Sequence, residues 1–259
     1  MLIERQMLPP LSSVKKALNV LEAFSDDQTE LGVTQIAELL NSHKSSISRI
    51  LMTLLAEGFV EKNPQTNKYR LGLKMVELGY RALKRFNLKE LATPFLEELA
   101  AKTNEIIHLA VLDKNEILYI DKRGKEQVLT VATRIGGRHP AYCSAMGKVL
   151  LAGLSHERLN EVLAMGPLRR FTPTTITQVP ILRKELERVR KQGFAIDNEE
   201  SFPGIQCVAA PIRNNQREVV AAISATVPKL RMGKQRMKEL IQLVTLCAQK
   251  ISERMKSVR

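Results

Sequence analysis

Short hydroxyl side chains and positive charges share one stretch in the N-terminal third of the chain, and both kinds of group bind nucleic acid. Hydroxyls donate hydrogen bonds to phosphate oxygens and base edges, while lysine and arginine neutralise phosphates. If the stretch is helical, these side chains lie on one face, opposite an apolar face. Such a polar face also occurs on helices that are merely exposed to solvent. The elements on either side of the stretch must therefore show whether it belongs to a DNA-binding motif. The residues concerned are Lys44, Ser45, Ser46, Ser48 and Arg49.

Three segments of the second half carry groups that suit a small organic anion. The first runs from Arg138 to Lys148 and leads into an expected helix at Ser144. Unpaired N–H groups at a helix start attract anions, and here they belong to Ala145 and Met146. The alternative is that Ser144 only caps the helix.

The other two segments lie on expected strands and the loop between them. Asp197 to Cys207 is an acidic stretch that brings carboxylate acceptors and a thiol together. Residues 221–226 alternate apolar and polar, so Ser224 and Thr226 share a sheet face that is either solvated or part of a pocket. Acceptors and hydroxyls of this kind can hold the hydroxyl groups of a ligand.

A cysteine-dependent enzyme is the rival interpretation, with Cys207 as nucleophile and His139 or His108 as base. The residues around Cys207 are apolar, and there a cysteine is more often a small buried hydrophobe than a thiolate. The 3 cysteines form no CxxC pair and the 4 histidines no ligand pair, which indicates neither a disulfide framework nor a metal site. We therefore predict no catalytic residue, metal or cofactor.

The elements around the polar face predict a winged helix-turn-helix over residues 13–72. In this interpretation Thr34 caps a first helix and Asn41 ends it. Ser45 or Ser46 caps a second helix, whose apolar residues recur at helical spacing until Gly58.

A wing follows as two short strands, Phe59–Lys62 and Lys68–Leu71, joined by a turn-rich segment. Its cations are placed for backbone phosphates or the neighbouring minor groove. A further helix at residues 13–25 precedes the unit. The predicted DNA-contacting set therefore adds Thr34, Lys62, Lys68 and Arg70.

The chain has 259 residues, which leaves room for a second domain with its own core. A net charge of +13 fits a polyanionic partner, although the cations are spread over both halves. No apolar run is long enough to span a bilayer, and the flexible N-terminus expected at residues 1–12 lacks a signal peptide's apolar core. These features predict a cytoplasmic protein that makes no membrane contact.

The remaining pattern predicts a linker helix and an α+β domain with an antiparallel sheet. The linker helix, residues 73–86, can pair with its copy in a homodimer, which would fix the spacing of two DNA half-sites. The second domain spans residues 87–259. Its expected strands are 106–112, 117–121, 128–134, 194–197, 207–212 and 219–226, and its expected helices are 87–102, 145–154, 157–164, 181–192 and 234–256.

These segments also resemble a known family. The winged helix, IGGRHPAYCSAMGKVLLA, GFAIDNEESFPGIQCVAAPI and VVAAISATVP together look like the IclR family of bacterial transcription regulators, over nearly the whole chain. The resemblance implies a GAF-like effector domain behind the winged helix and linker helix, and dimers or dimers of dimers on palindromic operators. It also implies small organic acids or aromatic carboxylates as effectors.

Carried over by position, the family's effector contacts match the three segments above. They fall on the backbone of Ala145 and Met146 beside Ser144, and on Asp197, Cys207, Ser224 and Thr226. The strings TRIGGRHPAYCSAMGKVLLA and IDNEE resemble the branch that responds to 2-keto-3-deoxygluconate and related sugar acids. Gly137 is a departure, because family members often carry a second basic residue there.

The predicted function is a transcription regulator that binds double-stranded DNA and senses a small carboxylate, a keto acid or sugar acid. A ligand-independent DNA-binding protein is a second rival, disfavoured by the size of the second domain and by its converging polar groups.

Overall fold

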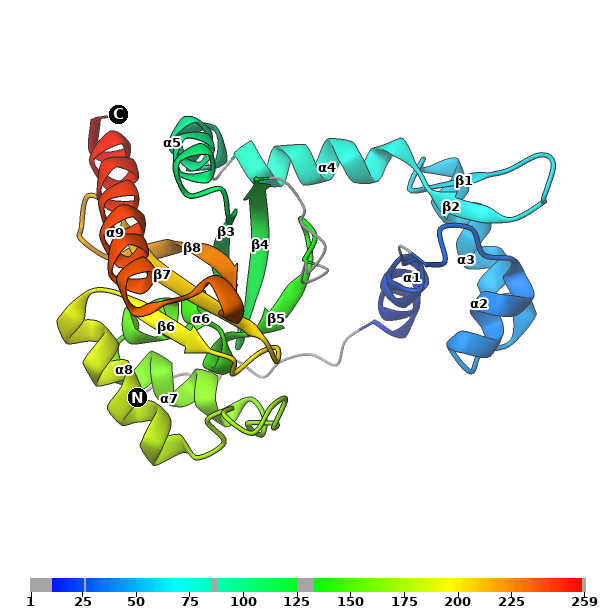
Figure 1. Cartoon of the computed structure of the whole chain (residues 1–259). Helices are drawn as coiled ribbons and strands as arrows, with labels where there is room; N and C mark the ends of the chain where they lie inside the picture. Colours follow the sequence, from blue (N-terminus) through cyan, green and yellow to red (C-terminus); the bar gives the residue numbers. More distant parts are fainter. Residues whose placement is uncertain (1–10, 26, 85–87, 125–132, 258–259) are drawn as a thin grey trace, which may run out of the picture. The chain divides into compact units, whose positions relative to one another are not determined.

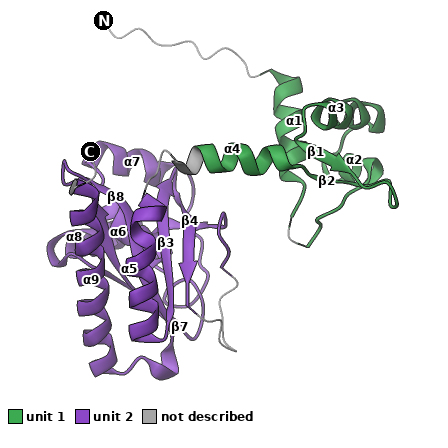
Figure 2. Cartoon of the chain, turned by 90° about the horizontal axis from the view of Figure 1, so that it is seen from above, with its two compact units in different colours: residues 1–86 green, residues 87–259 purple. Residues whose placement is uncertain are grey.

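The computed structural model describes residues 11–25, 27–84, 88–124 and 133–257. The chain divides into two compact units, residues 1–86 and 87–259, which we describe one at a time (Figure 2). The flexible N-terminus and the strand expected at residues 128–134 fall mostly outside the described residues. Within those residues, every helix is too short or too polar to cross a membrane.

The first unit is a small helical core with a hairpin, as a winged helix-turn-helix requires. Ile36, Ile47 and Leu51 are fully buried, because apolar residues at helical spacing share one face of each helix. The hairpin strands are antiparallel, with Glu61 opposite Arg70. The elements in order are α1 (Ser12–Glu22), α2 (Val33–Leu39), α3 (Lys44–Ala56), β1 (Val60–Lys62), β2 (Tyr69–Leu71) and α4 (Leu73–Lys84) (Figure 1).

Both core helices of this unit end where the sequence predicts. Asn41 and Gly58 have φ values of 45° and 75°, the left-handed conformation that follows many helices. After Gly58, the N–H of Phe59 reaches back to the carbonyl of Leu54 at 2.8 Å. The polypeptide therefore turns sharply at each residue, which places α3 against α2 and leads from α3 into the wing.

The predicted helix caps, by contrast, are wrong. α2 begins one residue before Thr34, and its first turn is closed by a hydrogen bond of 2.9 Å from the Gly32 N–H to Gln35 Oε1. The cause is a short bridge between Leu31 and Tyr69, which keeps the chain extended up to Gly32.

α3 also starts earlier than expected. His43 occupies its cap position, and no side chain bonds to the first turn. The carbonyl of His43 accepts the N–H groups of Ser46 and Ile47 at 3.0 and 3.2 Å. Ser45 and Ser46 therefore lie within the first turn and do not cap it.

Among the described residues, the second unit forms one antiparallel sheet in the order β5-β4-β3-β8-β7-β6, which confirms the predicted α+β class. α5 and α9 pack on one face of the sheet, and α6, α7 and α8 pack on the other. The elements are α5 (Leu88–Thr103), β3 (Ile106–Asp113), β4 (Glu116–Arg123), β5 (Arg138–Pro140), η1 (Ala141–Cys143), α6 (Ala145–Ala152), α7 (His156–Ala164), α8 (Val179–Gln192), β6 (Ala195–Asn198), β7 (Ile205–Arg213), β8 (Val219–Pro228), η2 (Lys229–Arg231) and α9 (Lys234–Ser257).

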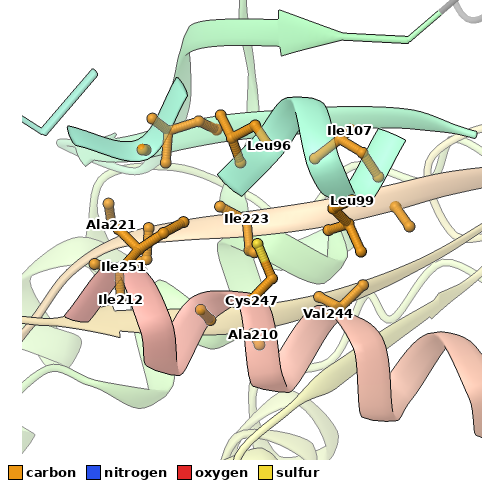
Figure 3. Packing of buried hydrophobic residues seen from close by; sticks show 14 of the residues in the cluster. Leu96, Leu99, Ile107, Ala210, Ile212, Ala221, Ile223, Val244, Cys247 and Ile251 are labelled. Carbon is orange, nitrogen blue, oxygen red and sulfur yellow. The ribbon is translucent and has the colours of Figure 1, made fainter. Parts of the chain in front are cut away.

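The alternation of side chains along the strands creates two different cores. On the α5 and α9 side, branched residues such as Ile107 and Ile223 pack against Leu96 and Val244 (Figure 3). On the other side the sheet presents small residues, including Ala209, and these let α6 approach closely. The same face carries the polar residues of the candidate site.

Candidate functional site

The polar face of α3 is accessible, and its cations are not engaged elsewhere. Lys44, Ser45 and Arg49 are exposed, and Ser46 and Ser48 are partly exposed. Within the described residues, neither Lys44 nor Arg49 has a side-chain ion pair or hydrogen bond. The first turn of α3 has no side-chain cap, so its N–H groups are available to a phosphate. This face can therefore meet DNA without breaking an internal contact.

The cations of the wing differ in how they are held. Arg70 forms a fork with the Glu61 opposite it, through Nε at 3.1 Å and Nη2 at 2.9 Å from Oε2. The ammonium of Lys62 lies 5.8 Å from the centroid of the Tyr69 ring. Lys68 is partly exposed on the same hairpin, and Thr34 is exposed at the start of α2. Arg70 is thus the one predicted contact that would have to leave a carboxylate to reach a phosphate.

A cavity in the second unit collects all the residues predicted to bind an effector. It lies between the sheet and the start of α6 and is partly open to solvent. Seven lining residues belong to the predicted set, namely Ser144, Ala145, Met146, Asp197, Cys207, Ser224 and Thr226. The others are His108, Tyr119, Thr133, His139, Ser201, Phe202 and Ile205.

Strand register explains why residues from distant segments meet there. Asp197 on β6 lies opposite Cys207 on β7, and Cys207 lies opposite Thr226 on β8. In the adjacent row, Ser224 on β8 lies opposite His108 on β3. All of these positions share one sheet face, and both Ser224, which is buried, and Thr226, which is partly exposed, line the cavity.

The opposite wall is the first turn of α6. Ser144 caps this helix, because its Oγ accepts the N–H of Gly147 at 3.0 Å. The N–H groups of Ala145 and Met146 donate to no backbone carbonyl among the described residues. A Cβ at Gly147 would lie 2.0 Å from the Ala141 carbonyl oxygen, so glycine is what allows α6 to begin this close to η1. Two free donors therefore face the cavity beside a capping hydroxyl.

Asp197 is the one carboxyl group among the lining residues that the structure describes, and it is only 2% exposed. Its Oδ1 accepts the N–H of Glu200 at 2.6 Å. Burial raises the pKa of Asp197 from 3.8 to about 6, against the lowering effect of that hydrogen bond and of the charge on Lys148. The group therefore changes its protonation close to physiological pH.

The two histidines of the cavity are neutral. His108 lies between two hydroxyls, with Nε2 2.7 Å from Thr133 Oγ1 and Nδ1 3.2 Å from Thr226 Oγ1. Burial lowers the pKa of His108 to about 3 and that of His139 to about 4. No residue that the structure places in the lining is a lysine or arginine. A ligand carboxylate would therefore meet backbone and hydroxyl donors and no side-chain cation.

The second histidine stands at an aromatic wall. His139 Nε2 lies 3.0 Å from Ser201 Oγ, and the hydroxyl of Ser201 donates to the Cys143 carbonyl at 2.9 Å. The ring stacks on Phe202 with centroids 5.3 Å apart. Because the Ser201 proton is already committed, the ring is expected to donate its Nε2 proton to Ser201.

The cavity histidines and Phe202 lie in the lining although they are not among the effector contacts that the sequence predicts. His108 is part of an apolar strand, IIHLAVLD, and a lone polar residue in a buried strand is the one signal that could have marked it. Its partners Thr133 and Thr226 are distant in sequence, so the contact itself was not predictable. Phe202 is found only once the loop is folded.

The geometry around the thiols does not fit a cysteine nucleophile. Cys207 donates to Thr226 Oγ1 at 3.4 Å, and burial raises the pKa of Cys207 far above its ordinary value. His139 contacts Cys143 at 3.4 Å, and burial raises the pKa of Cys143 to about 12. In the described part of the chain, no cluster of three His, Cys, Asp or Glu residues could hold a metal.

In comparisons with known proteins, each of the two units matches a model of the same protein family. A family model described as bacterial transcriptional regulator IclR C-terminal matches residues 80–253, and one described as IclR helix-turn-helix domain matches residues 13–64. The regulator XynR of Escherichia coli K12 is 37% identical over 217 residues, covering 84% of this chain and 86% of XynR. The regulator KdgR of the same organism is 36% identical over 245 residues, covering 95% and 93%.

A solved structure gives a similar result. The crystal structure of an IclR homologue of Microbacterium hydrocarbonoxydans, complexed with 4-hydroxybenzoate, matches with a TM-score of 0.84 at 27% identity. The match covers 94% of this chain and 99% of the homologue.

Proposed function

The chain belongs to the IclR family of bacterial transcriptional regulators, and we propose that a small carboxylate in the cavity of its second unit controls how its winged helices bind an operator. It is a DNA-binding regulator whose C-terminal domain binds a small molecule. The proposal also covers which residues contact DNA, which residues bind the effector, the chemical class of the effector and the oligomeric state.

One observation carries the effector assignment: all seven predicted contact residues line the same cavity. The ligand carboxylate would accept the free N–H groups of Ala145 and Met146, helped by the helix terminus. Asp197, Ser224 and Thr226 would then bind the ligand's hydroxyl or keto oxygen groups. Cys207 would pack against the ligand as a neutral thiol.

The composition of the lining favours a monoanion that carries several hydroxyl groups. With no side-chain cation in the described lining, a second ligand charge would be left uncompensated. The side-chain hydroxyls in the lining, such as that of Ser224, suit polar ligand atoms. These features support a keto acid or sugar acid.

For the DNA-binding unit, the proposed assignment places α3 in the major groove. Ser45, Ser46, Ser48 and Arg49 would contact base edges and phosphates, with Lys44 and Thr34 on the flanking backbone. Lys62, Lys68 and Arg70 of the wing would contact phosphates or the neighbouring minor groove.

A homodimer is supported by apolar side chains that the first unit leaves exposed. On α4, Leu73, Val76 and Tyr80 are 76%, 67% and 54% exposed and recur at helical spacing. α1 adds Val14 and Leu18, each 53% exposed. Exposed stripes of this kind mark interaction surfaces, and a dimer would present two winged helices to a palindromic operator. A dimer of dimers would extend the same arrangement, in the cytoplasm where the DNA lies.

The mechanism we propose needs two arrangements of the protein that bind the effector with different affinity. Only such a difference lets the effector bias operator binding, and the coupling must then be reciprocal. A cysteine enzyme is disfavoured because desolvation raises the pKa of the Cys207 thiol and keeps it neutral, and because the relatives are regulators. The protein is therefore proposed to have no catalytic residue and no cofactor.

Selection of bound duplexes from a random DNA pool tests the DNA-binding assignment. Wild-type protein is expected to enrich a palindrome whose half-sites lie about one or two helical turns apart. The Arg49→Ala variant should enrich it poorly. Enrichment of sequences without any common motif by the wild-type protein would contradict the assignment.

A further inference from the structure

Lys148 is a lysine with almost no access to solvent. It lies one turn along α6 from Ala145 and is only 1% exposed. Its ammonium donates to Glu200 Oε1 and to the carbonyl of Ile196, both at 2.5 Å, and lies 3.7 Å from Glu185 Oε1. A buried charge is kept only when it is paired and hydrogen-bonded, and this one meets both conditions.

The partners of Lys148 lie on both sides of Asp197. Ile196 immediately precedes Asp197 on β6, and the Glu200 N–H donates to Asp197 Oδ1 at 2.6 Å. The ammonium of Lys148 therefore binds the chain on both sides of Asp197, at Ile196 on β6 and at Glu200 in the turn that follows. Asp197 itself is not a hydrogen-bond partner of Lys148 in the structure.

The charge of Lys148 does not face the ligand. Lys148 is absent from the residues that line the cavity, whereas Asp197 is among them. Glu200 Oε2 is buried without a hydrogen-bond partner among the described residues, and Glu200 Oε1 accepts the ammonium and, at 3.5 Å, the Asn198 N–H. The ammonium is therefore the positive charge that compensates this carboxylate. The Lys148–Glu200 ion pair therefore lies outside the cavity lining, next to the strand and turn that carry Asp197.

We propose that Lys148 is the positioning residue for Asp197, fixing its carboxyl group in the cavity through Ile196 and Glu200 so that it can bind the effector. The proposal rests on the effector site described above. It gives the lysine a task in ligand recognition that a purely structural ion pair would not have.

The protonation of Asp197 provides a readout that needs no ligand. Lys148 lowers the pKa of Asp197 and Glu200 raises it, while burial has the largest effect. The other titratable groups of the cavity and its wall are Cys207 on β7, Cys143 in η1 and Tyr119 on β4, whose pKa values are raised, so each is neutral. His108 on β3 and His139 on β5 also line the cavity, and they are neutral because burial lowers their pKa values. The charges that act on Asp197 are therefore those of Lys148 and Glu200.

The first experiment titrates the full-length protein labelled with ¹³C at the aspartate carboxyl groups, with Asp197→Asn to assign the signal. Lys148→Met should raise the midpoint of Asp197 by about one pH unit or more, and Glu200→Gln should lower it. Lys184→Met, which removes an exposed lysine of α8, should leave it unchanged. Unchanged midpoints in both the Lys148 and the Glu200 variant would overturn the proposal.

The second experiment measures affinity for 4-hydroxybenzoate or for a keto acid or sugar acid that stabilises the wild-type protein. Lys148→Met should weaken binding about tenfold or more, but should have no further effect in the Asp197→Asn background. Equal losses in both backgrounds would show that Lys148 does not act through Asp197. If none of these ligands binds the wild-type protein, the effector assignment fails, while the titration still decides whether Lys148 controls Asp197.

Loss of Lys148 leaves Glu200 as an unpaired buried charge, so the single variant is at risk of unfolding. The double variant Lys148→Met with Glu200→Gln removes both charges and restores a neutral site. It should fold, yet bind the ligand as weakly as Asp197→Asn does. Wild-type affinity in this folded double variant would contradict the proposal.

Discussion

Asp197 on β6 stands directly opposite Cys207 on β7, so a carboxyl group and a thiol enter the same cavity from neighbouring strands. Asp197 is buried and Cys207 is partly buried, and both have a raised pKa, which keeps the thiol neutral and moves the titration of the carboxyl group up to about pH 6. A carboxyl group and a neutral thiol at neighbouring positions suit a site that binds a small molecule through hydrogen bonds.

Replacing Asp197 with asparagine should change how protein stability depends on pH. Because burial raises the pKa of Asp197 from 3.8 to about 6, the folded protein holds a proton that the unfolded chain releases. The stability contributed by this group is present below pH 3.8 and is lost as pH rises through 6. Asparagine has no such proton, so the variant gains about 2–3 kcal/mol relative to wild type between about pH 4 and pH 8.

Urea unfolding followed by circular dichroism at several pH values measures this difference. Asparagine and aspartate are similar in size, so packing changes add an offset that does not vary with pH. A difference between variant and wild type that stays constant from acid to neutral pH would show that Asp197 is not perturbed.

Arg49→Ala should weaken binding to the selected operator while leaving effector binding unchanged. Removing one arginine that contacts a base costs about 1–3 kcal/mol, or roughly tenfold or more in Kd. Fluorescence anisotropy with a labelled duplex measures this loss. Lys184→Ala, which removes a positive charge from the other unit, serves as the control and should bind normally. Loss of effector binding together with DNA binding would contradict the separation of the two tasks.

Glu61→Gln should strengthen DNA binding, because the carboxylate of Glu61 now holds the guanidinium of Arg70. The exposed pair contributes little to stability, so the fold should tolerate the change. The gain should be larger with Arg70 present than in the Arg70→Ala variant, as measured by anisotropy in a series of salt concentrations. Weaker binding by Glu61→Gln would mean that the pair holds Arg70 in its DNA-contacting position.

Val76→Asp should prevent the proposed dimer from forming. The side chain is 67% exposed on α4, so a carboxylate there leaves the folded unit intact but places a charge in an apolar interface. Sedimentation velocity at micromolar concentration should show a monomer, while Arg81→Ala on the same helix stays dimeric. A dimer that persists in Val76→Asp would place the interface elsewhere.

Local patterns in the sequence were sufficient for much of the fold. Ile47, Leu51 and Leu54 recur at helical spacing and are buried on one face of α3, as expected. Asn41 and Gly58 were recognised as helix ends because left-handed backbone favours those residue types. The helix start predicted at Thr34 is wrong, because a bridge between residues far apart in sequence determines where α2 begins.

In the candidate site, too, groups marked by a local pattern are predictable, whereas contacts between residues far apart in sequence are not. The local setting of Asp197, Ser224 and the start of α6, together with the family resemblance, predicts them as ligand groups. The contacts of His108 depend on Thr133 and Thr226, which only the folded sheet brings near it. Lys148 carries a weak signal, a single charge within an apolar helix, but its partners on β6 and the following loop are invisible in sequence.

A thermal-shift screen against keto acids, sugar acids and aromatic carboxylates tests the central claim most directly, because a ligand that binds only the folded state raises Tm. We predict that at least one hydroxylated monocarboxylate stabilises both the wild-type protein and Arg49→Ala, and that Asp197→Asn abolishes the shift. A ligand that stabilises Asp197→Asn as well as wild type would contradict the assigned site, and no shift in any class would contradict carboxylate sensing by this domain.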